Sequence, residues 1–300
     1  MNEITARAHA TSANIGVMFD CGAIAIRELY TDVTFKRLSS GHDITISGYG
    51  SDQIPVDENN LAFKAVKEYL SFTGHSLNGF SVRIDNHIPF SGGLGSSAAS
   101  IIATLAAVNA CFENSVSLMK LLDIALKIEH HGDNLLACLS GGFTMYSEHS
   151  RVKNDISDSL RGVLTIPDYK VSTLHARKVL PVNYSRADSV KALQYASILT
   201  YGIISNDMDA IKQVLESDVI HEPFRSLLNR DLNEVRQLAG ENNALGTTIS
   251  GSGAAIISFV SKENQEYLYH ALKKHFPDHH VIKISFINEG VTILNRYSCF

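Results

Sequence analysis

Three glycines and three serines, SGGLGSS at residues 91–97, stand directly before an apolar, alanine-rich segment from Ala98 to Cys111. Because glycine accepts positive φ and lets the main chain approach a neighbour closely, this stretch predicts a sharp turn. The apolar segment after it predicts a buried helix. The fold must therefore place this turn at the start of a helix that lies inside a core.

The Gly/Ser stretch also has a chemical interpretation. Its glycines can turn successive main-chain N–H groups toward one point, and the helix start adds the positive end of a helix dipole. Together these features favour a bound phosphate, and the hydroxyls of Ser96 and Ser97 can bind a phosphate oxygen or a magnesium ion. A plain structural turn is the alternative, because the lysine of GxxxxGK[ST] is absent and GxGxxG spacing does not fit.

Strands and helices are mixed along the chain without a regular strand–helix–strand repeat, which favours an α+β fold over a doubly wound sheet. In the first half we expect strands at residues 5–11, 43–47, 80–84 and 143–147, helices at 60–72, 98–111 and 117–130, and a loop at 12–22. In the second half we expect strands at 162–166, 170–174 and around 249–259, helices at 190–204, 208–215, 231–238 and up to 276, and two last strands. The polar segment 154–160 predicts a connection between two lobes, residues 1–155 and 156–300.

The bulk properties of the chain exclude several classes of protein. A net charge of −5 argues against a nucleic-acid-binding surface, which needs a basic patch. The first residues lack the layout of a secretory signal, and no apolar run is long enough to span a membrane. The four cysteines are scattered without metal-type spacing. We therefore expect a cytoplasmic protein with free thiols that binds neither nucleic acid nor a membrane.

Three segments, in order along the chain, resemble the three motifs of the GHMP kinase family. They are ATSANIGVMFDCG at residues 10–22, IPFSGGLGSSAAS at 88–100 and GTTISGSGAAIISF at 246–259. This resemblance implies a two-lobe α+β fold, with an N-terminal lobe like domain 2 of ribosomal protein S5 and a ferredoxin-like C-terminal lobe. It also implies a kinase that uses ATP and Mg²⁺ to phosphorylate the hydroxyl of a small molecule.

Four further matches resemble the branch of that family that phosphorylates L-homoserine in threonine biosynthesis, in which homodimers are common. They are LLDIALKIEHHGDNLLACLSGG at 121–142, STLHARKVLP at 172–181, HEPFR at 221–225 and the pair Phe19-Asp20. A zwitterion with one hydroxyl needs an anion for its ammonium group and guanidinium groups for its carboxylate. We expect Asp20 to serve the ammonium, and Arg177 and Arg225 to hold the carboxylate.

The resemblance implies roles for the other site residues. The expected catalytic residues are Asn134, Asp133, Ser97 and Glu129, with Ser97 and Glu129 also holding Mg²⁺. The expected ATP site comprises Asn60, Leu61, Pro89, Ser91, Gly92, Gly93, Leu94, Gly95, Ser96, Ser97 and Ala98. The expected substrate site comprises Asn14, Asp20, His131, Asn134, Thr173, Arg177, Arg225, Gly251 and Gly253.

Some choices stay open at this point. Asp133 is either a general base or a structural residue, because a loose phosphoryl-transfer transition state lets the proton leave late, with Asn134 orienting the hydroxyl. The alternatives for the whole chain are a GHMP kinase for another alcohol, such as mevalonate, and an inactive relative that binds a metabolite. The chain departs from the family pattern at Met18, Ser91-Gly92, His130, Gly132 and Ala254-Ala255.

Overall fold

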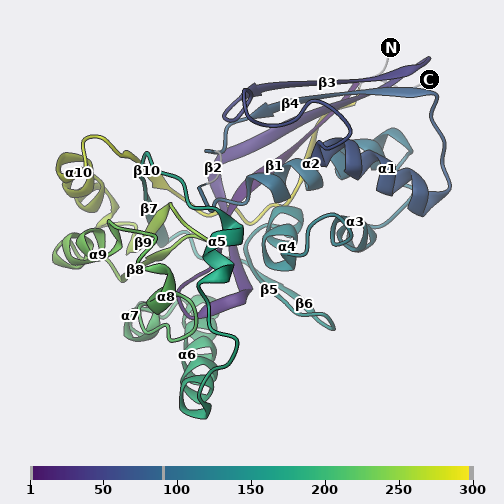
Figure 1. The fold of residues 1–300 in the computed structure, drawn as a ribbon. Coiled ribbons are helices and arrows are strands. Elements are labelled where there is room, and N and C mark those ends of the chain that lie inside the picture. The colour runs from purple at the N-terminus through teal and green to yellow at the C-terminus, as the bar shows by residue number, and fades with distance from the viewer. Residues whose placement is uncertain (1–2, 90–91, 297–300) are drawn as a thin grey trace.

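The computed structural model describes residues 3–89 and 92–296. Its two β-sheets lie in two adjoining lobes, and each sheet has helices packed on one face (Figure 1). The first sheet has the order β11-β1-β2-β4-β3, with the hairpin β5–β6 paired to β2. Its strands are β1 (Glu3–Asn14), β2 (Met18–Leu38), β3 (Gly41–Gly48), β4 (Gly79–Asn86), β5 (Phe143–Tyr146), β6 (Arg151–Asn154) and β11 (Thr292–Arg296).

The first sheet is covered by four helices: α1 (Leu61–Thr73), α2 (Ser96–Cys111), α3 (Leu118–Ala125) and α4 (Gly132–Ser140). Helix α2 packs against β1 and β2 and is buried along almost its whole length. This burial explains why its sequence is apolar on every side. The turn at its start is thereby fixed to the middle of the lobe.

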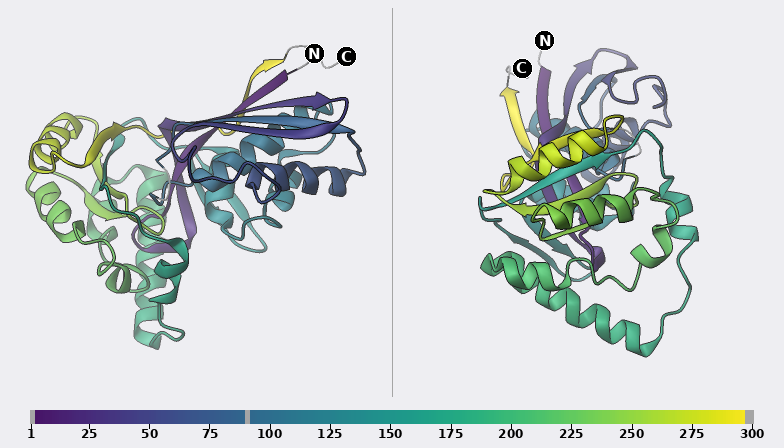
Figure 2. Two further views of the ribbon diagram at one scale, coloured as in Figure 1. Left: turned by 45° about the horizontal axis from the view of Figure 1, so that its top comes forward. Right: turned by 90° about the vertical axis from the view of Figure 1, so that its left-hand side faces the viewer.

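The second sheet has the order β10-β7-β9-β8, with every neighbouring pair antiparallel. Its strands are β7 (Leu160–Ile166), β8 (Gly246–Ile249), β9 (Ile256–Ser261) and β10 (His280–Ile284). The helices of this half are α5 (Thr173–Lys178), α6 (Arg186–Ser205), α7 (Met208–Val214), α8 (Glu222–Arg225), α9 (Leu232–Glu241) and α10 (Gln265–His275). Helices α9 and α10 cover one face of this sheet. The right-hand view of Figure 2 shows that α6 lies apart from these two helices.

One apolar core joins the two lobes. It includes Ile24 and Ile26 of β2, Leu164 of β7, Ile257 and Phe259 of β9, all buried. The last strand, β11, returns to the first sheet and pairs antiparallel with β1, so the two ends of the described chain lie side by side. Because the lobes share a core, a site between them is held by packed elements on both sides.

The α+β class is confirmed, but three local expectations are wrong. The expected loop 12–22 is instead a tight turn at residues 15–17 between β1 and the long strand β2, with Ile15 buried. The expected helix 117–130 ends at Ala125, and the separate helix α4 begins at Gly132. The alternating residues 170–174 predict a strand, yet Ser172 precedes the short helix α5.

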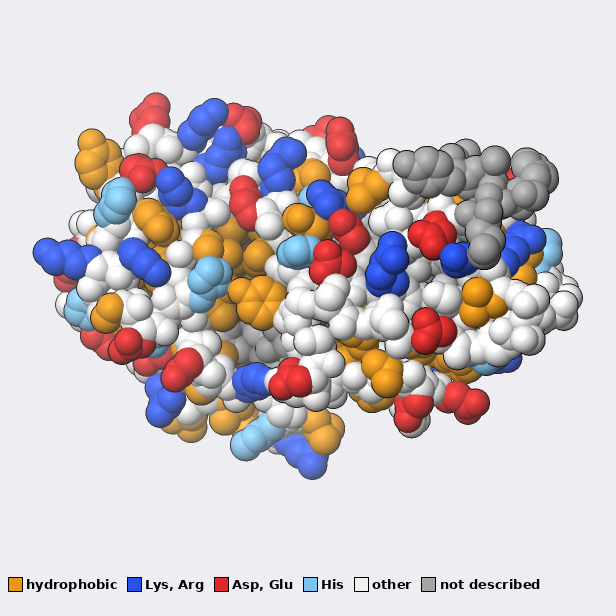
Figure 3. Space-filling view, turned by 90° about the horizontal axis from the view of Figure 1, so that it is seen from above, with side chains coloured by type: hydrophobic (Ala, Val, Ile, Leu, Met, Phe, Trp, Pro, Cys, Tyr) orange, Lys and Arg blue, Asp and Glu red, His pale blue; other side chains and the backbone are white. Residues whose placement is uncertain are grey.

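The structure shows two further properties, one of its helices and one of its surface charges. Among the described residues, no helix combines the length and the apolar character that crossing a membrane requires. On the face seen in Figure 3, acidic and basic side chains are interspersed and neither sign forms a continuous field. The division of the chain at residues 155 and 156 stays a prediction.

Candidate active site

A cavity of about 240 Å³ lies between the lobes, and residues from six distant segments line it. Its walls bring together most of the residues expected for the site: Asn14, Asp20, Pro89, Gly92, Gly93, Leu94, Gly95, Ser96, Ser97, Glu129, His131, Asp133, Asn134, Thr173, Arg177, Arg225 and Gly251. Ser252, which lies in the third motif between Gly251 and Gly253, also lines the cavity, although it is not among the expected site residues. Asp20, Arg177 and Arg225 therefore converge, as the homoserine interpretation requires.

The Gly/Ser turn forms one wall of this cavity. Gly93 and Gly95 have φ of 72° and 68°, in the region that favours glycine. A Cβ on Gly93 would lie 2.2 Å from the carbonyl oxygen of Ser250, and one on Gly95 would lie 2.1 Å from Oγ1 of Thr11. The main chain is therefore pressed between the two lobes. Helix α2 starts at Ser96 without a side-chain cap, so its first N–H groups face the cavity region.

A second cavity of about 210 Å³ adjoins the first, and Ser96 and Ser97 line both. Its other walls include Ile54, Pro55, Asn60 and Leu61. Asn60 has a local structural role, since its Oδ1 caps α1 by accepting the N–H of Ala62 at 2.8 Å. The second cavity is a mainly apolar recess that leads to the Gly/Ser turn.

Two of the expected site residues, Ala98 and Gly253, do not line these cavities in the structure. Ala98 is wholly buried in α2 and supports the turn from behind. Gly253 packs against Asn229, because a Cβ there would lie 2.2 Å from Oδ1 of Asn229. Ser91 lies outside the described residues.

Arg225 is the most unusual charge in the molecule, because its side chain is buried, with the residue only 2% exposed. Its Nε donates to the carbonyl of Ala176 at 3.0 Å, and Nη1 donates to the carbonyl of Gly251 at 3.1 Å. The guanidinium lies 5.1 Å from the ring centre of Phe19. Burial lowers the pKa of Arg225 from its usual value. No carboxylate of the described residues forms an ion pair with it.

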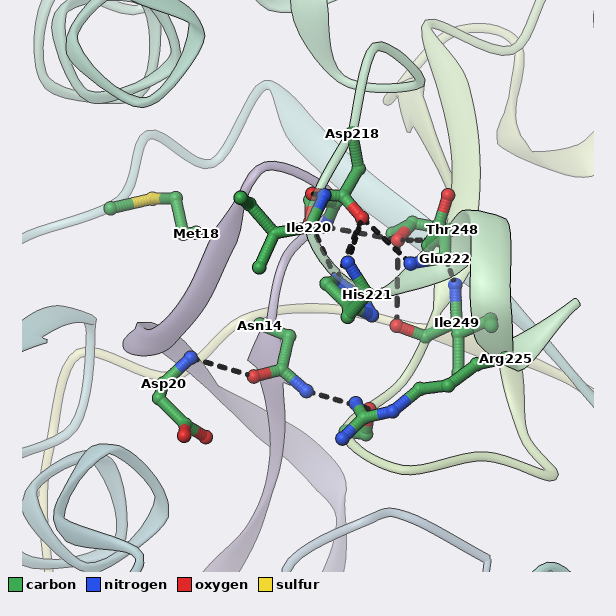
Figure 4. Close-up of polar contacts among 12 residues, drawn as sticks. Asn14, Met18, Asp20, Asp218, Ile220, His221, Glu222, Arg225, Thr248 and Ile249 are labelled. Atoms are coloured by element: carbon green, nitrogen blue, oxygen red, sulfur yellow. Dashed lines mark hydrogen bonds and ion pairs between the residues drawn. The ribbon is translucent and has the colours of Figure 1, made fainter. Parts of the chain in front are cut away.

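A buried network behind the cavity fixes Arg225 (Figure 4). Asp218 accepts the N–H groups of His221 and Glu222, each at 2.7 Å, and so begins the short helix α8. Glu222 in turn accepts the N–H of Ile249 at 2.7 Å, which ties α8 to β8. The HEPFR segment indicates Arg225, but its Glu222 supplies the anchor that the sequence comparison does not identify.

Asn14 joins the two lobes at the same point. Its Oδ1 accepts the N–H of Asp20 at 3.0 Å, and its Nδ2 donates to the carbonyl of Gly251 at 2.6 Å (Figure 4). That carbonyl also accepts from Arg225. Asn14 has φ of 71°, a conformation that asparagine tolerates better than most residues. Its carboxamide therefore holds Asp20 and the Gly251 loop in fixed positions.

Asp20 and Arg177 form a two-point ion pair, with N–O distances of 2.9 and 3.0 Å. Nε of Arg177 also donates to Nε2 of His131 at 3.2 Å. His131 contacts Glu129 through Nδ1 at 2.9 Å, and this hydrogen bond raises the pKa of His131. Both members of the ion pair are exposed at the cavity mouth, where such pairs contribute little to stability.

Asp133 and Asn134 occupy the first turn of α4. Asp133 is buried, and this burial raises the pKa of its carboxyl to about 6. Its Oδ1 accepts the N–H of Asn134 at 2.8 Å. The hydroxyl of Thr11 donates to Oδ1 of Asn134 at 2.7 Å, which fixes the orientation of that carboxamide. Thr11 is a positioning residue that lies within the first motif but is not among the expected site residues.

Glu129 and Ser97 line the same cavity. Oε1 of Glu129 contacts His131, whereas its Oε2 is buried and has no hydrogen-bond partner in the structure. A buried carboxylate oxygen without a partner is costly unless it faces a cation or a ligand. Within the described ranges, no three His, Cys, Asp or Glu side chains cluster as a complete metal site.

Comparison with known proteins places the chain in a family. The model of the GHMP kinase N-terminal domain matches residues 60–142, and that of the GHMP kinase C-terminal domain matches residues 199–278. The homoserine kinase of Campylobacter concisus is 34% identical over 289 residues, which cover 95% of this chain and 97% of that one. The homoserine kinase of Aliarcobacter butzleri is 32% identical over 288 residues, with the same coverage.

A solved structure agrees with these matches. The homoserine kinase of Cytophaga hutchinsonii superimposes with a TM-score of 0.91 at 29% sequence identity, and the match covers 98% of each chain. The expected two-lobe GHMP kinase architecture is thereby confirmed, and the alternatives of another alcohol kinase or an inactive relative are not favoured. The chain is an ATP-dependent phosphotransferase that acts on a hydroxyl group, and it belongs to the homoserine kinase branch of the GHMP kinase family.

Proposed function

We propose that this chain transfers the γ-phosphoryl group of ATP to the side-chain hydroxyl of L-homoserine, forming O-phospho-L-homoserine. The observation that carries the proposal is the buried guanidinium of Arg225, which has carbonyl partners but no carboxylate partner among the described residues. Such a buried cation favours an anionic ligand that completes its charge and hydrogen bonding. Arg177 and Asp20 on the same cavity supply a second guanidinium and an anion.

The nucleotide would occupy the two adjoining cavities. The adenine would lie in the recess lined by Ile54, Pro55 and Leu61, whose surface is mainly apolar. The phosphates would lie along the Gly93–Ser97 turn, where main-chain N–H groups and the start of α2 favour negative charge. Ser96 and Ser97 line both cavities, so one ligand can reach from the recess to the turn.

Mg²⁺ fits the remaining donors. We assign Ser97 and Glu129 as its protein ligands, because the buried Oε2 of Glu129 lacks any partner in the structure. One carboxylate is enough, since Mg²⁺ in kinase sites is bound by one or two carboxylates together with the substrate phosphates and waters. When bound, the ion would neutralise negative charge on the transferring phosphoryl group.

The acceptor would replace the contact between Asp20 and Arg177. Its ammonium group would pair with Asp20, and its carboxylate would lie between Arg177 and Arg225. Both charges of the ion pair then keep a partner, so the exchange costs little electrostatic energy. Thr173, His131 and the Gly251 loop would form the polar walls around the backbone of the substrate.

We assign no obligatory general base. Asn134 would orient the hydroxyl, because Thr11 already fixes its carboxamide. Asp133 is buried behind Asn134 and accepts its main-chain N–H, which suits a positioning residue. The proton of the hydroxyl can pass to the phosphoryl group late in the transfer, since catalysis here is mainly positioning and charge stabilisation.

We also propose that the protein acts in the cytoplasm as a homodimer. The cytoplasmic assignment is supported by the free thiols of Cys21 and Cys138, which suit a reducing compartment.

An ADP-release assay with a substrate panel tests the proposal. With ATP and Mg²⁺, we expect turnover with L-homoserine and not with L-serine, L-threonine or mevalonate. Arg177→Met should raise the KM for L-homoserine by about 30-fold, the loss of one charge-assisted contact. The control Arg161→Met removes an arginine paired with Asp158 in the second lobe and should leave the KM unchanged. Turnover with another alcohol and not with L-homoserine would refute the substrate while keeping the phosphotransferase.

A further inference from the structure

Helix α6 presents an apolar surface to solvent, on the side opposite its buried face. Leu199, Gly202 and Ile203 are buried against the molecule. Val190, Leu193, Tyr201 and Ile204 are exposed on the other side, Leu193 by 70% and Tyr201 by 61%. We call these four residues and the exposed Ser197 between them the α6 stripe. A surface helix normally carries polar residues on its outer face, whereas a helix that is apolar on both sides is usually covered on both.

The charge distribution on α6 is equally unusual. Its charged residues, Arg186, Asp188 and Lys191, all lie in its first six positions, and residues 192–205 contain no charge at all. Helix α6 lies at the margin of the molecule, where α7 packs against it and its outer side is open (Figures 1 and 2). Solvent alone does not account for a long uncharged outer face.

The spacing of the α6 stripe is symmetric about its centre. The steps between successive members are three, four, four and three residues, with the small residue Ser197 in the middle. If two copies of α6 pack antiparallel with Ser197 on a two-fold axis, Val190 faces Ile204 of the second copy, and Leu193 faces its Tyr201. Every apolar member of the stripe then meets an apolar partner, which is the self-complementarity that a two-fold interface needs.

The ends of the helix are complementary in charge in the same arrangement. Arg186, at the N-terminal end, would face residue 208 of the second copy, between Asp207 and Asp209. Arg186 and Asp209 are both exposed, and neither forms an ion pair within the described part of the chain. A parallel arrangement would instead bring the two copies of Arg186 together, which repels. We therefore infer that the α6 stripe is the interface between two copies of this chain, packed antiparallel about Ser197.

Sedimentation velocity on the full chain tests the interface. We expect the unmodified protein to be a dimer, and Tyr201→Glu to weaken association by about 100-fold, because the charge enters the apolar contact twice. The matched control is Tyr267→Glu on α10, where the tyrosine is 71% exposed and far from the stripe in the fold. This control should remain a dimer. A monomeric unmodified protein, or a Tyr201→Glu variant that still dimerises, would overturn the inference.

Cysteine cross-linking tests the antiparallel register. Ser197→Cys places two thiols at the axis and should give a disulfide-linked dimer under mild oxidation, beyond any background in the unmodified chain. In Val190→Cys the two thiols would be separated by about 20 Å along the helices, too far to join. Cross-linking through Val190→Cys and not Ser197→Cys would contradict the register. A monomer that co-sediments with phosphatidylcholine vesicles through this stripe would assign the surface to a membrane instead.

Discussion

The two ends of the active-site cavity are constructed differently. The proposed nucleotide end takes its phosphate-binding wall from one contiguous segment, residues 92–97, in which main-chain N–H groups and glycine conformations would do the binding. The acceptor end collects single side chains from distant elements: Asp20 from β2, His131 before α4, Arg177 from α5 and Arg225 from α8. The first end depends on backbone shape, and the second depends on the placement of charge.

Because of this difference, substitutions at the two ends should have different effects on folding and on binding. Adding a Cβ to Gly93 at the nucleotide end forces it against the main chain of Ser250, so binding and folding should suffer together. Removing a charge at the acceptor end leaves the fold largely intact, because Asp20 and Arg177 are exposed and their pairing contributes little to stability. Glu129 lies where the two ends meet. Its replacement should therefore lower kcat more than it raises the KM for either substrate.

Glu129→Gln should have the largest effect of the substitutions considered. The change keeps the shape but removes the charge that we assign to Mg²⁺, so kcat should fall by about 1,000-fold, as for other losses of preorganised charge. The melting temperature should stay the same or rise, since the negative charge on a buried oxygen without a partner is removed. Steady-state kinetics across a Mg²⁺ series measures this, with the exposed Glu148→Gln as control. A loss below about tenfold in kcat would exclude Glu129 as a ligand.

Arg225→Lys sharpens the acceptor side of the comparison. Lysine keeps the positive charge but cannot reach both the Ala176 carbonyl and a carboxylate with a planar fork. We expect kcat/KM for L-homoserine to fall by about 100-fold while the KM for ATP changes less than about twofold. Measuring the KM for L-homoserine and the KM for ATP in parallel tests this expectation. Equal rises in both would mean that Arg225 supports the whole cavity and does not bind the acceptor.

Gly93→Ala tests the backbone side. We expect the KM for ATP to rise by about tenfold and the free energy of unfolding to fall by about 2–3 kcal/mol, as a left-handed residue meets the Ser250 carbonyl. The matched control is Gly41→Ala, which has nearly the same φ, 74° against 72°, but no atom within 4 Å of the added Cβ. It should lose only the conformational part, about 1 kcal/mol, with normal kinetics. Equal losses in both variants would show that the close contact is unimportant.

The sequence predicts the turn and the buried helix at the nucleotide end because these two elements are contiguous in the chain. The glycines and the apolar helix stand next to each other in the chain, and the structure adds only that Thr11 and Ser250 press on the turn from both lobes. For the acceptor end, residue types indicate candidates such as Arg177 and Arg225. The partners that position them are contributed by tertiary packing: Glu222 anchors α8, and Asn14 bridges Asp20 and Gly251.

The wrong local expectations have physical causes. Residues 12–22 contain small residues and two glycines, which favour a loop, but Ile15 and Met18 are buried and the chain turns within three residues. The helix expected through His130 ends early because Glu129 and His131 turn toward the cavity. Helix α4 can then begin at Gly132, which packs against the ring of Tyr146 where a Cβ would collide. Neither packing contact is visible in local periodicity.

The smallest kinetic effect, but a clear pH dependence, is expected for Asp133→Asn. Burial raises the pKa of Asp133 in the folded state to about 6, above its ordinary value near 3.8. The folded protein therefore binds a proton more tightly than the unfolded chain, so this carboxyl makes stability fall as pH rises from about 4 to about 6. Asp133→Asn removes that slope and should gain about 2 kcal/mol relative to the unmodified protein between pH 4.5 and pH 7.5. Urea unfolding at the two pH values measures it. Because Asp133 is not assigned as a base, kcat should fall by less than about tenfold, and a loss near 1,000-fold with unchanged stability would instead make it the base.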